Sequence, residues 1–149
     1  MKNPRALPML LGLLAAIGSA SLQAADADGR QRVEMSAEAR AELRAEMLDF
    51  QAALHSIVGA LAEQQFAQAA DIAEKNIGVS AMGRHRNAPA NARPGMFMPN
   101  DMHAIARSMH TAASDFAKVA RNGDTTKALA SLQAVTGACI ACHHGYRTQ

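Results

Sequence analysis

The chain has 149 residues, a length that fits one modest domain, and its 15 Lys and Arg residues nearly balance 13 Asp and Glu residues. No basic patch stands out, so the charge pattern gives no reason to expect binding to nucleic acid or to an anionic membrane. Aromatic residues make up only 3% of the chain, so few large side chains are available for a core.

The N-terminus has the pattern of a secretory signal peptide. Lys2 and Arg5 provide a positive start, an apolar run follows, and small residues precede Ala24. The run is too short for a membrane span, although a retained membrane anchor is the alternative. We therefore expect a signal peptide over residues 1–24 and a mature domain over residues 25–149, with no membrane attachment. Loss of Lys2 and Arg5 leaves 13 basic residues against 13 acidic ones, so the mature chain is close to neutral.

The first half of the mature domain predicts two helices. Residues 25–34 are polar and are expected to be loose, and Ser36 is a suitable N-cap for the first helix. The apolar positions of that helix, spaced alternately by four and three residues as in a bundle, are Leu43, Met47, Phe50, Leu54, Ile57 and Leu61. A turn at residues 63–65 leads into the second helix, which Gly78 is expected to end. The apolar face of the second helix is formed by Phe66, Ala70, Ala73 and Ile77.

A long loop is expected between the second and third helices, because residues 78–99 are rich in Gly and Pro. The third helix is predicted to begin at Asn100 or the residue before it and to end at Gly123, and Asp124 is the predicted cap of the fourth. The inward positions of the third helix are Met102, Ile105, Met109, Phe116 and Val119. Those of the fourth helix are Leu129, Leu132, Thr136, Cys139, His143 and Tyr146. This pattern predicts an all-α fold, an antiparallel four-helix bundle with a long loop between the second and third helices.

The fourth helix carries a motif that indicates covalent haem. Cys139, Cys142 and His143 form C-x-x-C-H, in which two thiols can add to the vinyl groups of a porphyrin and the imidazole can bind iron. On a helix these side chains share one side. The alternatives are a zinc site that also uses His144 and a redox dithiol. No second Cys cluster and no strand–helix–strand pattern supports either alternative, and haem would use both cysteines.

The segment from Cys139 to Arg147, C-I-A-C-H-H-G-Y-R, on the last helix of a four-helix chain resembles the end of the cytochrome c-prime family. The resemblance implies one haem c attached through Cys139 and Cys142, with His143 as the proximal iron ligand and Arg147 near it. It also implies a periplasmic location and a possible homodimer through the first two helices. The alternative for Arg147 is a solvated charge near the chain end.

The ligand on the other side of the iron is open to two interpretations. Members of the family either have no protein ligand there and bind nitric oxide or carbon monoxide, or use a Met of the first helix. The heptad spacing favours Met47 as the distal ligand, whereas aligning Leu43-Arg44 with the Tyr-Arg pair of high-spin members places Leu48 there. One residue is about 100° of helix rotation, so the two assignments conflict. Arg44 or Arg40 is a candidate partner for a haem propionate.

We expect single-electron transfer with Met47 and His143 as iron ligands, and the redox partner protein is not indicated. The alternative is a five-coordinate haem that binds or buffers nitric oxide or carbon monoxide. A third hypothesis is periplasmic copper binding, because thioether and imidazole groups suit copper. The candidate copper ligands are Met82, His85, Met96, Met98, Met102, His103, Met109 and His110. No nucleophile–base set stands out, so we expect no enzyme activity.

Overall fold

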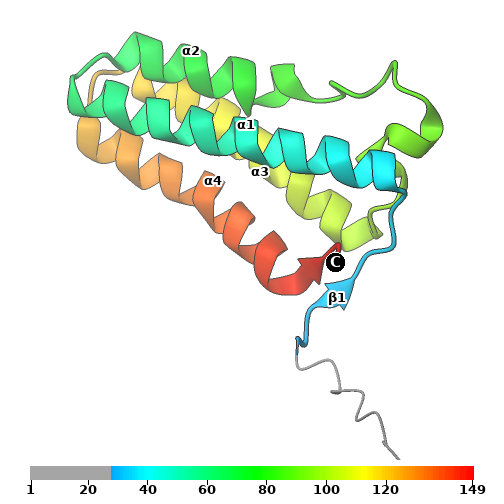
Figure 1. Cartoon of the computed structure of the whole chain (residues 1–149). Helices are drawn as coiled ribbons and strands as arrows, with labels where there is room; N and C mark the ends of the chain where they lie inside the picture. The colour runs from blue at the N-terminus through cyan, green and yellow to red at the C-terminus, as the bar shows by residue number, and fades with distance from the viewer. Residues whose placement is uncertain (1–27) are drawn as a thin grey trace, which may run out of the picture.

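The computed structural model describes residues 28–149, and the predicted signal peptide lies outside them. The principal elements are α1 (Ala37–Ala62), α2 (Phe66–Asn76), α3 (Asn100–Ala120) and α4 (Thr125–Gly145). Helix α1 packs against α2, α2 against α3, and α3 against α4, so helices adjacent in sequence are adjacent in space (Figure 1). The predicted all-α four-helix bundle with a long loop between the second and third helices is confirmed. In the described part of the chain, no helix combines the length and the apolar character that a membrane span requires.

Capping and turn residues determine where α1 and α2 begin and end. The Ser36 hydroxyl accepts a hydrogen bond from the Ala39 backbone N–H at 3.0 Å, which confirms Ser36 as the N-cap of α1. The turn into α2 passes through Gln64, whose φ of 59° lies in the left-handed region. A Cβ added at Gly78 would come within 2.8 Å of the Glu74 carbonyl oxygen, so only glycine fits where α2 stops.

The loop after α2 is built from three short 3₁₀ turns. They are η1 (Val79–Ala81), η2 (Ala90–Ala92) and η3 (Pro94–Met96). Arg84 links the loop to α1 through an ion pair with Asp49 at 2.8 Å. The loop lies at the end of the bundle where α1 begins and the chain ends (Figure 1).

The turn between α3 and α4 follows the predicted pattern. Gly123 has a φ of 75°, which glycine adopts without strain. The Asp124 carboxylate then accepts a hydrogen bond from the Lys127 backbone N–H at 3.0 Å and caps α4. Together with the side chain of Lys127, this hydrogen bond lowers the pKa of Asp124 below its ordinary value.

Alanine accounts for about half of the buried apolar residues, as the scarcity of aromatic residues suggests. On α4 the buried stripe runs through Ala128, Leu132 and Val135. Leu129, which we predicted to face inward, is instead 47% exposed. The small Ala128 faces the core, so the next residue, Leu129, points outward.

Residues 28–34 are ordered against the bundle, which corrects the expectation of a loose segment for this described part of residues 25–34. Two short strands, β1 (Gln31–Arg32) and β2 (Tyr146–Arg147), pair in parallel. The Val33 N–H extends this pairing with a hydrogen bond to the Arg147 carbonyl at 2.8 Å. We call residues 28–35 the N-terminal strap.

Two apolar side chains anchor the strap. Val33 is 3% exposed and Met35 is 9% exposed, and both belong to a small core cluster with Ala39 and Met102. Their burial explains why a mostly polar segment packs onto the bundle. Tyr146, predicted to continue the face of the fourth helix, lies in β2 instead, because α4 ends at Gly145.

Candidate haem site

The three motif residues occupy the last turns of α4 and differ in exposure. Cys139 and Cys142 are half-buried and form no disulfide, whereas His143 is exposed. The Cys139 thiol donates to the Val135 carbonyl at 3.4 Å. Burial raises the pKa of both thiols, so they stay protonated at neutral pH. Two sulfur atoms at the margin of the core beside an exposed imidazole provide the donor set that covalent haem requires.

Side chains of α1 and α4 border the same two core clusters. Met47 of α1 and Cys139 of α4 both pack against the main cluster. About one helical turn away on each helix, Leu43 and Cys142 both pack against the small cluster that holds the strap. The backbones of α1 and α4 are not among the closely packed helix pairs. Thiols on one helix and apolar side chains on the other therefore flank a common region, an arrangement that fits a haem.

The two candidates for the distal position differ in their surroundings. Met47 is half-buried against the main cluster, whereas Leu48 is 60% exposed. This placement agrees with the heptad spacing and gives α1 the inward face that the sequence predicts. Ligation of iron by Met47 stays a prediction.

The strap and the C-terminal tail surround the backbone of the motif with charged groups. The Arg147 side chain is only 14% exposed, and its Nε lies 3.7 Å from a carboxylate oxygen of Asp28. Arg30 pairs with the same carboxylate and donates to the His143 carbonyl at 3.4 Å. The hydrogen bonds from Arg30 lower the pKa of Asp28 to about 2. The alternative of a solvated terminal charge at Arg147 does not fit this environment.

The two propionate candidates have different environments. Arg40 donates to the Thr148 carbonyl at 3.2 Å and so adds a link between α1 and the tail. Arg44 is exposed. Their pairing with a propionate stays a prediction.

Six of the eight candidate copper ligands lie together. A cavity of about 320 Å³ between α1, the loop and α3 is lined by Met82, His85, Met96, Met98, His103 and His110. Met102 and Met109 are instead part of the core, at 5% and 8% exposure. Within residues 28–149, no group of three or more His, Cys, Asp or Glu side chains is arranged to hold a metal ion.

The arginines of this cavity were not among the residues predicted from the sequence to form a site. Its lining also includes Arg84, Arg86, Arg93 and Arg107. The available signal was the density of Arg residues within a short stretch that spans the loop and the first half of α3. We call this space the arginine cavity.

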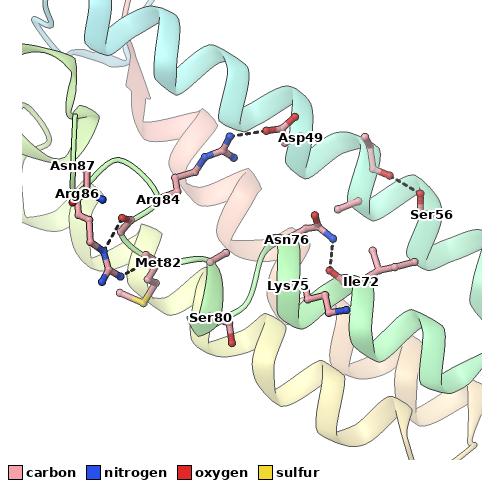
Figure 2. Close-up of a pocket in the computed structure, with 14 residues that line it drawn as sticks. Asp49, Ser56, Ile72, Lys75, Asn76, Ser80, Met82, Arg84, Arg86 and Asn87 are labelled. Carbon is pink, nitrogen blue, oxygen red and sulfur yellow. Dashed lines mark hydrogen bonds and ion pairs between the residues drawn. The ribbon is translucent and has the colours of Figure 1, made fainter. Parts of the chain in front are cut away.

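A larger cavity of about 940 Å³ lies between α1, α2 and the loop, and none of the motif residues lines it (Figure 2). Figure 2 shows Arg84 reaching to Asp49 across this space, while Arg86 binds carbonyl groups of its own loop. Arg84 and Arg86 line both cavities, so this part of the loop separates them.

Comparison with known families gives one match. Residues 37–147, from the start of α1 to the end of β2, match the family described as Cytochrome C′. The match includes Cys139, Cys142 and His143. No curated protein and no solved structure matches the chain.

Proposed function

Because this chain belongs to the cytochrome c′ family, whose members are haem-binding c-type cytochromes, we propose that it carries one haem c in the periplasm and transfers single electrons. The observation that supports electron transfer is the placement of Met47. Its side chain borders the same core cluster as Cys139, while the neighbouring Leu48 is exposed. A thioether opposite a histidine is the axial pair found in electron-transfer cytochromes c and raises the reduction potential.

Each motif residue has a role in this proposal. Haem, when bound, supplies reversible one-electron chemistry at iron. Cys139 and Cys142 would hold it through two thioether bonds, and His143 would bind iron on the proximal side. Arg147, packed beside Asp28, would keep a positive charge near the proximal side. The hydrogen bond from Arg30 to the His143 carbonyl would help to hold the end of α4 in place.

The test is truncation of Met47 in the holo protein. Met47→Ala is expected to convert a low-spin spectrum to a high-spin one, to remove the long-wavelength sulfur-to-iron absorption band and to lower the midpoint potential. Absorption spectroscopy and a redox titration measure these changes. Leu48→Ala is the matched control, because it truncates the adjacent apolar side chain of α1, and it should leave the spectrum unchanged. A high-spin wild-type spectrum that Met47→Ala does not alter would contradict ligation by Met47.

The second candidate function is binding or buffering of nitric oxide or carbon monoxide by five-coordinate haem. The alignment of Leu43-Arg44 with the Tyr-Arg pair of high-spin family members supports it, because that alignment puts the apolar Leu48, which cannot bind iron, at the distal position. Titration of the reduced protein with carbon monoxide separates the two functions. Rapid, tight binding without displacement of a protein ligand would favour gas binding, whereas slow binding that accelerates in Met47→Ala would favour electron transfer.

The proposed role involves no catalysis by the protein side chains. Electrons would pass to and from a redox partner protein, and the mature protein would need neither nucleic acid nor a membrane. A homodimer through α1 and α2 is part of the proposal, because members of the family commonly associate through these helices. Light scattering of the purified holo protein would give the oligomeric state.

A further inference from the structure

The arginine cavity has an unusual charge balance for a space of its size. At about 320 Å³ it falls at the small end of the range for ligand pockets, roughly 300–1,000 Å³. Its lining holds the four arginines together with Glu46, which is the only carboxylate among the lining residues. With neutral imidazoles, the lining therefore carries an excess of positive charge.

Only part of this positive charge is neutralised by the protein. Arg84 is paired with Asp49 at 2.8 Å. The other three arginines form no ion pair with any residue in the described part of the chain. Arg86 donates to carbonyls of its own loop, Arg93 donates to the Ala88 carbonyl at 2.6 Å, and Arg107 contacts the His103 ring. A guanidinium has five N–H donors, so these contacts leave donors for a ligand.

The same surroundings make the cavity a poor cation site. His85 has its two ring nitrogens 3.4 Å and 3.6 Å from carboxylate oxygens of Glu42 and Glu46. One ring nitrogen of His110 is engaged by the Ile77 carbonyl, and one of His103 by Arg107. The thioethers of the lining remain possible soft ligands, yet a copper ion would have to enter among uncompensated arginines.

We propose that the arginine cavity binds a small oxyanion with two negative charges, either phosphate or a short dicarboxylate, with Arg93 and Arg107 as principal contacts. Both oxyanions offer paired oxygen atoms that a guanidinium can bind with two hydrogen bonds. Of the two cavities described, Arg93 and Arg107 line this one alone, whereas Arg84 and Arg86 line both. The site is separate from the cysteine motif and does not depend on the redox function.

The cavity nevertheless adjoins the haem region. Glu46 in its lining precedes Met47 in α1, and Met98 both lines the cavity and packs against the small cluster that Cys142 borders. A bound anion would therefore lie close to the proposed redox centre. Its negative charge should favour the oxidised state and lower the midpoint potential.

The experiment is calorimetric titration of the holo protein with inorganic phosphate and, separately, with malonate. We expect one site for at least one of the two anions, and the comparison shows whether the cavity prefers a tetrahedral oxyanion or a dicarboxylate. Arg107→Gln and Arg93→Gln should each weaken binding by about tenfold or more, which corresponds to about 1.4 kcal/mol. Arg107→Gln is the cleaner variant, because Arg93 also holds a loop carbonyl.

Arg121→Gln is the matched control. It removes one positive charge at the end of α3, where Arg121 pairs with Asp71 at 2.6 Å, and it should leave the affinity unchanged. Absence of binding by the holo protein would overturn the proposal, including the case in which haem propionates fill the cavity. Equal weakening by Arg121→Gln and Arg107→Gln would also overturn it, because the effect would then be general surface charge. Tight binding of Cu(I) that Arg107→Gln strengthens would identify a metal site instead.

Discussion

Cys139 and Cys142 lie in surroundings that differ from those of His143. Burial raises the pKa of the two thiols, and a reactive dithiol needs the opposite shift, toward thiolate. The structure therefore disfavours the redox-dithiol interpretation of the motif. The His143 imidazole is exposed, while the His143 backbone carbonyl accepts a hydrogen bond from Arg30.

At the scale of one residue, the lowered pKa of Asp124 leads to a prediction about how stability depends on pH. In the folded protein, the hydrogen bond from the Lys127 N–H lowers the pKa of the Asp124 carboxyl below its ordinary value of 3.8. The carboxylate therefore contributes fully to the free energy of unfolding above about pH 4, and this contribution is lost as the pH falls through the pKa of the folded state. Asp124→Asn keeps an N-cap acceptor but cannot titrate. It should therefore reduce the loss of stability below about pH 4, measured by urea unfolding of the holo protein.

Asp101→Asn provides the control, because it removes an exposed carboxylate from the first turn of α3. The prediction fails if both variants have the same pH dependence as the wild-type protein.

At the scale of elements, the strap is the feature that sequence patterns did not reveal. Helix boundaries depend on local signals such as Ser36 and Gly78, and these signals predicted the four helices closely. The strap depends on residues far apart in the chain, as shown by Arg30 and His143, which are separated by 113 positions. A polar segment with two isolated apolar residues gives no local indication of such pairing. The predicted inward orientation of Leu129 was wrong for a related reason. Helix α4 has apolar residues on both sides of its buried stripe, so the sequence pattern does not single out the buried face.

The strap also leads to a stability prediction. Val33→Ala removes two methyl groups from a side chain that is 3% exposed, and we expect the free energy of unfolding to fall by about 2 kcal/mol. Val58→Ala makes the same chemical change at a position on α1 that is 53% exposed, and its effect should stay within about 0.5 kcal/mol. Denaturant unfolding of both variants measures the difference. Equal effects would mean that the strap contributes no more than a surface residue.

The same contrast applies to the candidate site. The spacing of Cys139, Cys142 and His143 was sufficient to predict haem, because three residues in one helical segment carry the chemistry. The partner of Arg147 and the arginine cavity could not be predicted in this way, since each is assembled by tertiary contacts between separate elements.

At the scale of the whole molecule, the bundle has a core poor in large side chains. The main cluster is rich in alanine, and α1 and α4 are not among the closely packed helix pairs. Haem bound between these helices would supply apolar surface that the side chains do not, so the cofactor should stabilise the folded chain.

Removal of the cofactor tests this view. The haem-free chain, obtained as the variant Cys139→Ala/Cys142→Ala, should unfold at a temperature lower by about 10 °C, because each kcal/mol lost shifts the midpoint by several degrees. Circular dichroism measures the transition. Gln133→Ala, an exposed substitution on the same helix, should retain haem and the wild-type midpoint. An unchanged midpoint in the haem-free chain would show that the helices reach full stability alone.

The parallel pairing of β1 with β2 has a consequence for the order of events during biosynthesis. Arg32 precedes α1 and Arg147 follows α4, so their pairing must wait until all four helices have been translated. Both cysteines precede Arg147 and are therefore already present when this pairing forms. An attachment machinery that acts before this pairing forms would therefore meet Cys139 and Cys142 without the strap beside them.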